Sequence, residues 1–321
     1  VSTARAYFER FVARFPDVGA LAAASIDDVL ALWAGLGYYS RAIHLHRAAQ
    51  RVVQEYGGGL PEDIESLRRL PGIGRSTAGA ILALSRSQRH PVLDANARRV
   101  LARVFGVDDS AAGSRARRLW ELAEACTPQT RVAEYTQAIM DLGSTVCTRS
   151  RPRCDACPLA GICLAKAEGR QDTLPPRANR RPRPRRTAYA LVLTDGCGRL
   201  LLQRRPPRGF WPGLWSFPTF ETRAAAWQWL ASNFPEAAPL PTSLPPQRHV
   251  FTHFELDLRL VRARLRSRCT VVPASDCRWH DPEAADLAAT KAVALLRGDV
   301  IMSNKSAAAL PEPLPAQPQR P

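Results

Sequence analysis

Apolar residues recur every three or four positions through most of the first half of the chain. One such stripe, followed by three glycines at 57–59, consists of Ala42, Leu45, Ala49, Val52 and Tyr56. This spacing places the apolar side chains on one face of a helix, and glycine commonly ends a helix. The pattern runs from Ala4 to about Leu142 with short polar breaks, and it predicts a bundle of helices.

The pattern changes in the second half, where short strand-like runs replace the helical period. These runs lie at 189–193, 200–203 and 256–260, and the last alternates Leu, Asp, Leu, Arg, Leu. Such alternation predicts a strand with one buried face. Helical patterns at 223–230 and 284–296 accompany the strands. The second half is therefore predicted to be an α+β domain.

A segment rich in arginine and proline separates the two halves. Residues 170–186 contain seven arginines and four prolines, a composition that cannot bury a core. We expect a helical domain over 1–166, an extended linker over 167–187 and the α+β domain over 188–298. The tail at 299–321 is expected to be disordered, because five of its last sixteen residues are prolines.

The charge balance favours a polyanionic partner. The 321 residues include 45 Lys and Arg against 29 Asp and Glu, which gives a net charge of +16 and a pI near 10.4. Nucleic acid is the favoured class of partner. No apolar run reaches the ~18 residues of a membrane span, which argues against a membrane protein. Because no signal segment stands at the start, we expect a cytoplasmic, nucleoid-associated protein in a reducing setting. We also expect a monomer.

Four of the eight cysteines have the spacing of metal ligands. Six, two and five residues separate Cys147, Cys154, Cys157 and Cys163. Four thiolates suit either a structural zinc ion or an iron-sulfur cluster. Structural zinc more often shows two separated Cys-x2-Cys pairs, and this sequence has one, so the spacing favours the cluster. The remaining four cysteines are interpreted as ordinary thiols.

Two segments are candidates for contact with DNA phosphates. The loop between the first two ligand cysteines contains Arg149, Arg151 and Arg153. A metal-held loop would direct them at phosphates, and the alternative is a solvated charged loop. The second segment has Gly72 and Gly74 directly before Arg75 and Ser76 at a predicted helix start. Its glycines allow a tight turn with exposed amides, although a plain interhelical turn remains the alternative.

Asp94 directly precedes the helical run 97–104. An aspartate in this position is by default a helix N-cap. Capping does not exclude catalysis by the same carboxylate.

Together these features resemble the MutY family of adenine DNA glycosylases, within the helix-hairpin-helix DNA glycosylase superfamily. The resemblance covers nearly the whole chain. It is carried by the four cysteines and by the segments Gly35–Tyr39, Leu70–Gly79, Leu93–Asn96 and Met140–Gly143. It implies a mainly α-helical helix-hairpin-helix domain with a 4Fe-4S cluster loop, followed by an α+β Nudix-like domain. The implied activity is removal of adenine mispaired with 8-oxoguanine or guanine in double-stranded DNA, a step of base excision repair.

The resemblance also implies a role for individual residues. Asp94 would stabilise the sugar cation formed as adenine leaves, with Asn96 orienting the groups around it. The hairpin with Gly72, Gly74, Arg75 and Ser76 would hold the DNA backbone near the extruded adenosine. Tyr38 would fill the stack beside 8-oxoguanine, because a base must leave the duplex to be reached. Since bifunctional relatives have a nucleophilic lysine where this chain has Ser76, a monofunctional enzyme is expected.

The sequence departs from the family pattern at the proton donor for the departing adenine. The family's catalytic Glu belongs to a segment just before the residues that match Val1, so we expect an N-terminally truncated chain with impaired excision. Glu9, Glu55 and Glu65 lie on helical patterns and are interpreted as surface charges.

The second domain resembles the Nudix-like domain of the same family through residues 201–206 and 209–218. The helix after Phe220 lacks the Glu-rich pattern that binds magnesium in MutT-type hydrolases, so nucleotide hydrolysis is disfavoured. The segment Phe251, Thr252 and His253 matches the family's Phe-Ser-His loop that reads 8-oxoguanine, with Thr in place of Ser. Two rival hypotheses remain, a Nudix hydrolase and a non-catalytic iron-sulfur protein that binds damaged DNA.

Overall fold

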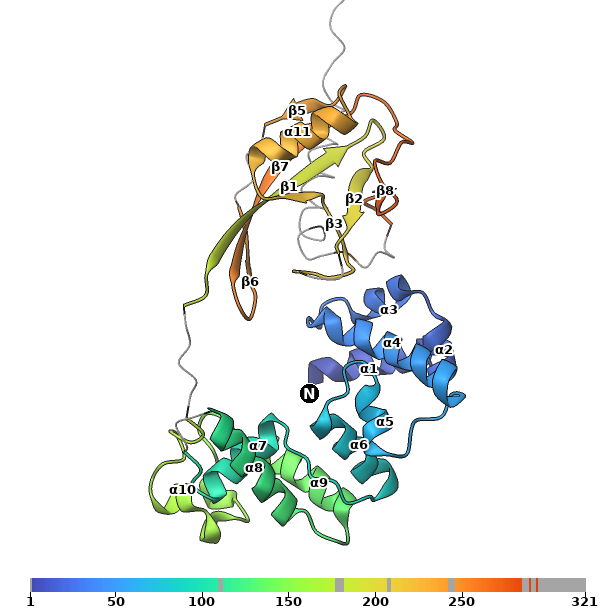
Figure 1. Ribbon diagram of the computed structural model, residues 1–321. Helices are drawn as coiled ribbons and strands as arrows, with labels where there is room; N and C mark the ends of the chain where they lie inside the picture. The colour runs from blue at the N-terminus through green and yellow to red at the C-terminus, as the bar shows by residue number, and fades with distance from the viewer. Residues whose placement is uncertain are drawn as a thin grey trace, which may run out of the picture. The chain divides into compact units, whose positions relative to one another are not determined.

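The computed structural model describes residues 2–108, 112–176, 182–206, 209–241 and 246–284, together with 289 and 293 (Figure 1). The predicted tail at 299–321 and most of the predicted helix at 284–296 lie outside the described residues. Within the described part, no helix combines the length and apolarity needed to cross a bilayer.

The first half of the chain is helical, which confirms the predicted class. Its elements are α1 (Ser2–Arg14), α2 (Val18–Ala23), α3 (Ile26–Trp33), α4 (Tyr39–Tyr56), α5 (Ile64–Arg69), α6 (Arg75–Arg86), α7 (Ala95–Val104), α8 (Ala112–Cys126), α9 (Val132–Asp141), the π-turn η1 (Leu142–Val146), the 3-10 turns η2 (Cys154–Ala156) and η3 (Ala160–Ile162), and α10 (Leu164–Ala167). α4 ends before Gly57, as predicted, and buries Ala42, Ala49 and Val52. Leu45 of the predicted stripe is 40% exposed.

By their internal contacts the residues form two compact units. The first unit comprises residues 1–16, 24–43 and 182–321, and the second unit comprises 17–23 and 44–181. The first therefore combines α1, α3 and the start of α4 with the sheet. The domain boundaries at 166 and 188 remain predictions.

The second unit is built around α7. Val100 and Leu101 of this helix are almost completely buried and share a core with Leu119 of α8 and Ile139 of α9. A helix buried on this scale cannot shift without repacking its neighbours. The residues at the start of α7 are thereby held in place.

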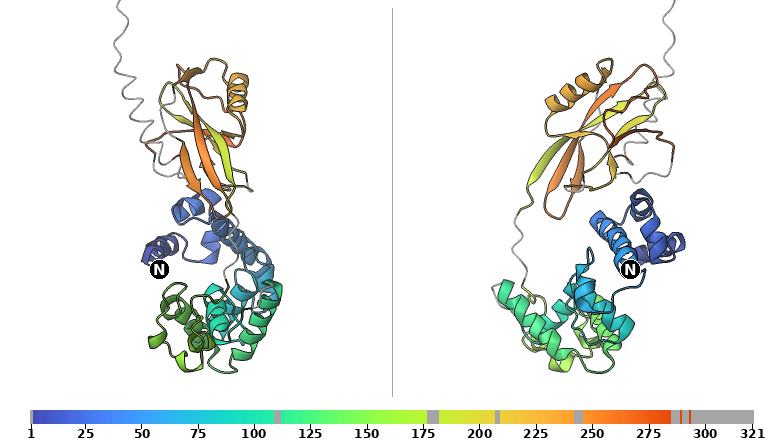
Figure 2. Two further views of the ribbon diagram at one scale, coloured as in Figure 1. Left: turned by 90° about the vertical axis from the view of Figure 1, so that its left-hand side faces the viewer. Right: turned by 45° about the vertical axis from the view of Figure 1, so that its right-hand side comes forward.

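The first unit contains an eight-stranded sheet. The strands are β1 (Arg185–Thr194), β2 (Leu200–Arg204), β3 (Trp215–Ser216), β4 (Thr219–Phe220), β5 (Ala238–Leu240), β6 (Gln247–Val250), β7 (Glu255–Arg264) and β8 (Cys277–His280). β1 and β7 pair in parallel over their full length, from Arg185 opposite Glu255 to Thr194 opposite Arg264. α11 (Arg223–Asn233) packs Ala226 and Leu230 against the sheet (Figure 2). The predictions at β1, β2, β7 and α11 are confirmed.

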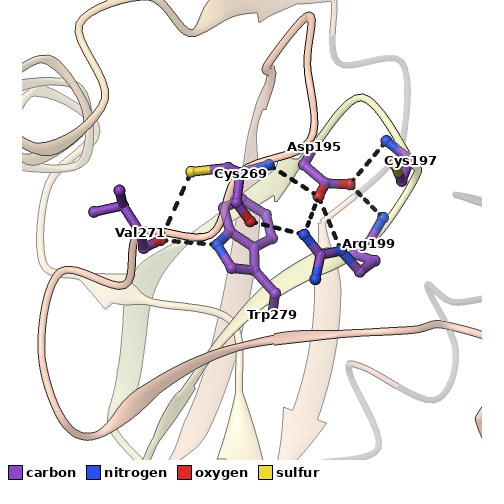
Figure 3. A network of polar contacts seen from close by, with 6 residues as sticks. All are labelled: Asp195, Cys197, Arg199, Cys269, Val271 and Trp279. Atoms are coloured by element: carbon purple, nitrogen blue, oxygen red, sulfur yellow. Dashed lines mark hydrogen bonds and ion pairs between the residues drawn. The ribbon is translucent and has the colours of Figure 1, made fainter.

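A buried carboxylate fixes the turn between β1 and β2 (Figure 3). The Asp195 side chain is fully buried and accepts hydrogen bonds from the backbone amides of Cys197 and Arg199 at 3.0 and 2.9 Å. It also pairs with the Arg199 guanidinium at 2.7 Å, and Arg199 in turn donates to the Cys269 carbonyl at 2.7 Å. Every oxygen of this buried charge is satisfied, so the network stabilises the turn.

The beginning of the predicted linker is folded instead of extended. Leu174 is only 2% exposed, and its carbonyl accepts a hydrogen bond from Arg103 at 2.9 Å. The backbone amides of Thr173 and Leu174 both donate to the Arg170 carbonyl, which makes a turn. Arg170 also forms an ion pair with Asp108. The buried Leu174 and the ion pair of Arg170 with Asp108 thus fold the segment up to residue 176, although its composition predicts an extended linker.

Candidate active site

Asp94 lies at the N-terminus of α7 and caps it, as expected. Its Oδ1 accepts a hydrogen bond from the Ala97 amide at 2.7 Å, and its Oδ2 accepts one from Asn96 Nδ2 at 3.2 Å. The carboxylate borders a pocket of about 420 Å³ that Arg98 and Arg149 also line. A carboxylate held by two donors, next to cationic side chains, is a fixed negative charge at the wall of a pocket.

Arg99 holds Asn96 and connects it to the cysteine loop. Its guanidinium donates to Asn96 Oδ1 at 2.9 Å, to the Cys147 carbonyl at 2.7 Å and to the Gly143 carbonyl. Burial lowers the pKa of Arg99. A methyl group at Gly143 would lie only 2.6 Å from Asn96 Cβ, so the two backbones are in direct contact. The sequence did not predict these contacts, and Arg99 was not among the expected site residues.

The hairpin has the geometry that its glycines predict. α5 ends at Arg69, Gly72 has a φ of +81°, and Gly74 caps α6 without a side-chain hydrogen bond. A Cβ at Gly72 would come within 2.8 Å of His44 Cβ, so glycine is required there. The first amides of α6 have no side-chain cap, which suits a phosphate ligand.

The two residues after the hairpin have partners inside the protein. The Arg75 guanidinium lies 3.9 Å above the Trp120 ring. The Ser76 hydroxyl accepts a hydrogen bond from the Leu93 amide at 3.1 Å. Ser76 therefore links α6 to the residue just before Asp94, a contact that the sequence did not predict. DNA binding by Arg75 and Ser76 stays a prediction.

Tyr38 is an exposed aromatic residue on a rigid loop of the first unit. Its side chain is 66% exposed and its φ is +49°, a region that non-glycine residues rarely adopt. The loop is fixed by Trp33 Nε1, which donates to the Gly37 carbonyl at 3.0 Å, and by the Tyr39 hydroxyl, which accepts from the Gly35 amide at 3.3 Å. The Arg41 guanidinium lies 5.0 Å above the Tyr38 ring. This arrangement suits a side chain that inserts between bases.

The structure brings the four spaced cysteines to one cavity of the second unit. All four thiols are free, and they line the cavity together with Arg103 and apolar side chains. Arg103 is 2% exposed and donates to Cys147 Sγ at 3.2 Å. Burial, and then the charges of the other three sulfurs, raise the pKa of Cys154.

A single metal ion and a metal cluster place different demands on the four sulfurs of this cavity. A zinc ion needs all four sulfurs within about 2.3 Å of a single point, whereas an iron-sulfur cluster spreads its cysteine ligands around a larger body. The cavity and its sulfurs therefore suit a 4Fe-4S cluster bound by Cys147, Cys154, Cys157 and Cys163.

The three loop arginines have different surroundings, although all are exposed. Arg149 lines the pocket beside Asp94. Arg153 donates to the Thr145 carbonyl at 2.8 Å, so it also holds its own loop. Arg151 has a φ of +52°. Of the three predicted phosphate contacts, the one by Arg149 has the most support, because Arg149 and the candidate catalytic carboxylate of Asp94 line the same pocket.

The predicted base-reading segment forms the tip of the hairpin between β6 and β7, in the first unit. The Phe251 amide donates to the Phe254 carbonyl at 2.9 Å, and the two rings stack at 4.7 Å. Thr252 and His253 are exposed at the tip. The aromatic pair closes the hairpin and leaves the two polar side chains available to a ligand.

Three segments of the chain match models of known protein families. Residues 1–125 match the HhH-GPD superfamily base excision DNA repair protein, 147–163 the iron-sulfur binding domain of endonuclease III, and 188–295 the NUDIX domain. The chain is 32% identical over 266 residues to an adenine DNA glycosylase of Buchnera aphidicola subsp. Acyrthosiphon pisum, covering 83% of this chain and 75% of that protein. It is also 32% identical to the adenine DNA glycosylase of Homo sapiens, covering 90% of this chain and 63% of the human protein. A solved endonuclease III–DNA complex aligns at a TM-score of 0.47 and 18% identity, covering 52% of this chain and 78% of that one.

Proposed function

This chain belongs to the family of adenine DNA glycosylases, and we propose that it hydrolyses the N-glycosidic bond of adenine mispaired with 8-oxoguanine or guanine in double-stranded DNA. The observation that carries this proposal is the Asp94 carboxylate. It is fixed by Ala97 and Asn96 at the wall of a pocket, next to arginines that suit a phosphate backbone. The step belongs to base excision repair.

Asp94 supplies the charge that the reaction needs. Breaking the glycosidic bond leaves an oxocarbenium-like sugar, and a preorganised carboxylate stabilises such a cation without having to move. Asn96 and the Ala97 amide hold the carboxylate, and Arg99 holds Asn96. The 4Fe-4S cluster, when bound, fixes the cysteine loop by metal–sulfur bonds. The chemistry at the sugar is left to the protein's own side chains.

The departing adenine must also receive a proton. Three carboxylates considered from the sequence do not fit the role of proton donor, because each forms an ion pair on an exposed surface. Glu9 pairs with Arg5 at 2.8 Å, and Glu65 pairs with Arg68 at 2.9 Å. The hydrogen bond from Arg51 lowers the pKa of Glu55, so that this group is ionised at neutral pH.

The β6–β7 hairpin supports recognition of the oxidised base. Thr252 and His253 present a hydroxyl and an imidazole at an exposed tip, and both groups can hydrogen-bond a base edge. Thr adds a methyl group to the Ser of the family pattern, so the preference for 8-oxoguanine over guanine is expected to differ from that of a Ser-containing variant. Thr252→Ser is the direct comparison.

Single-turnover adenine release tests the proposal. The protein is assayed on duplexes with adenine opposite 8-oxoguanine, guanine or thymine. We expect release from the first two duplexes, and we expect Asp94→Asn to slow it by about a hundredfold or more without loss of binding. Tight binding to the 8-oxoguanine duplex without any release would favour the non-catalytic alternative.

Borohydride trapping on abasic DNA tests the monofunctional prediction. Ser76 has no amine and its hydroxyl is occupied by the Leu93 amide, so it cannot form a Schiff base. We expect no efficient covalent adduct. A stoichiometric adduct would show that another residue acts as the nucleophile.

A further inference from the structure

Two arginines lie on aromatic side chains at and beside the tip of the β6–β7 hairpin. We call the rings of Phe210, Phe251 and Phe254 the aromatic platform, because Phe210 lies 6.2 and 6.4 Å from the other two rings. The Arg205 guanidinium lies 4.2 Å above Phe210, and the Arg186 guanidinium lies 4.8 Å above Phe254. Each cation therefore contacts a ring of the aromatic platform, and two rings of this platform belong to the hairpin tip.

These arginines differ from their neighbours in having no carboxylate partner among the described residues. Arg204 pairs with Asp27, and Arg248 pairs with Glu255. No such pair is formed by Arg205, and its Nε is buried without a hydrogen-bond acceptor. Burial without a compensating charge lowers the pKa of Arg205. Arg186 is exposed and also unpaired in this part of the chain.

An unpaired, partly buried guanidinium costs folding free energy, because the charge loses water without gaining an anion. The aromatic face offsets part of this cost but offers no hydrogen-bond acceptor. A planar guanidinium beside a ring still has N–H donors that match the paired oxygens of a phosphate. Two such cations on one platform form a site for an anion that reaches the protein from outside.

We propose that Arg186 and Arg205 bind backbone phosphates of the DNA strand that carries 8-oxoguanine, on either side of that base. The inference rests on the proposed function, since it takes the tip residues Thr252 and His253 as the readers of the base. Arg186 contacts Phe254 and Arg205 contacts Phe210, beside the tip, so phosphates adjacent to a base held at the tip are the anions that these cations suit. The aromatic contacts hold both guanidinium groups in place before DNA arrives.

The salt dependence of binding measures these contacts. Each phosphate contact contributes about 0.9 to the slope of log K against log salt for duplex DNA. R186Q and R205Q in the full chain should each lower the slope by about that amount for the 8-oxoguanine duplex. Between 50 and 200 mM salt, the wild-type protein should then lose about 3.5-fold more affinity than either variant. R248Q is the matched control. It also removes one positive charge, here from β6 of the β6–β7 hairpin, but Glu255 already neutralises Arg248.

Substitution of single phosphates by neutral methylphosphonates identifies the strand. Replacing a phosphate beside 8-oxoguanine should weaken the wild-type protein, and R205Q or R186Q should show no further loss at the matching position. R205K keeps the charge and should retain the slope while losing part of the affinity. If R205Q does not fold, R186Q gives the same test from an exposed strand position.

Four outcomes oppose the inference or its premises. Slopes equal to wild type in R186Q and R205Q would overturn it, and so would matching losses on the adenine strand only. Failure of the wild-type chain to prefer 8-oxoguanine over guanine opposite adenine would instead refute the premise that Thr252 and His253 read the oxidised base. Failure to release adenine from either duplex would refute the proposed function itself. Discrimination that persists with unchanged slopes leaves both intact and removes only the arginine contacts.

Discussion

Gly143→Ala tests whether the cysteine loop positions the candidate catalytic segment. Gly143 lies in the π-turn η1 (Leu142–Val146), where its carbonyl accepts a hydrogen bond from Arg99. A Cβ on this residue would lie 2.6 Å from Asn96 Cβ, 2.9 Å from Asn96 Cα and 3.0 Å from Asn96 C. Two of these three atoms are backbone, so the clash cannot be relieved by rotating a side chain. The turn and the start of α7 must separate.

The expected cost follows from this geometry. Overpacking a well-filled site typically costs about 1–3 kcal/mol, and backbone contacts belong at the upper end of that range. The displacement falls on Asn96, whose amide holds Asp94 Oδ2 at 3.2 Å. A shift of about 1 Å in a catalytic group can reduce the rate about a hundredfold. Gly143→Ala should therefore lower both the free energy of unfolding and the rate of adenine release.

Gly113→Ala is the matched control, because its Cβ would meet no atom within 4 Å and Gly113 lies in α8. Chemical denaturation with the cluster bound, and single-turnover adenine release, measure the two effects. Gly113→Ala should leave stability unchanged or slightly raised, since alanine favours a helix over glycine. If Gly143→Ala behaved like this control in both assays, the contact between η1 and Asn96 would have no role in holding Asp94.

Three further predictions concern contacts within the second unit. Arg99→Gln should slow adenine release more than it weakens DNA binding in a filter-binding assay, because it frees Asn96 while leaving the surface arginines intact. Ser76→Ala should lower the free energy of unfolding by about 1–3 kcal/mol, since the Leu93 amide loses its acceptor; an unchanged denaturation midpoint would contradict this. Burial raises the pKa of Tyr135 to about 12, so stability is fully retained below pH 10 and falls as the pH rises towards 12. Tyr135→Phe should reduce that alkaline loss of thermal stability, and an identical pH profile would refute the assignment.

Much of the fold could be predicted where the pattern is local. β1 and β7 have long apolar or alternating runs, and both were found at the predicted places. β5 and β6 were missed because each is short and neither contains a buried residue. Their pairing with β7 depends on that longer strand and not on their own residues. Strand partners of this kind cannot be predicted from a short window of sequence.

The candidate site shows the same division between local and distant information. The cap at Asp94 and the turn at Gly72 follow from nearby residues, and the structure contains both. The roles of Arg99 and Ser76 depend on partners 48 and 17 positions away in the chain. Similarly, Leu174 was assigned to the linker because its arginine- and proline-rich surroundings hid one buried contact with Arg103. Composition describes an average, whereas packing depends on single residues.

The polar residues on one face of α7 connect the cysteine loop with the Asp94 segment. Asn96, Arg99 and Arg103 are spaced by three and four residues, so they share one face of α7. Arg99 and Arg103 donate to carbonyls at the end of η1 and in the loop that follows, including those of Cys147 and Thr148, which no regular helix satisfies. Guanidinium groups are retained there because apolar side chains would leave these acceptors unpaired. The cysteine loop and the Asp94 segment are therefore held by one set of hydrogen bonds, and disorder in the loop removes the support of the carboxylate.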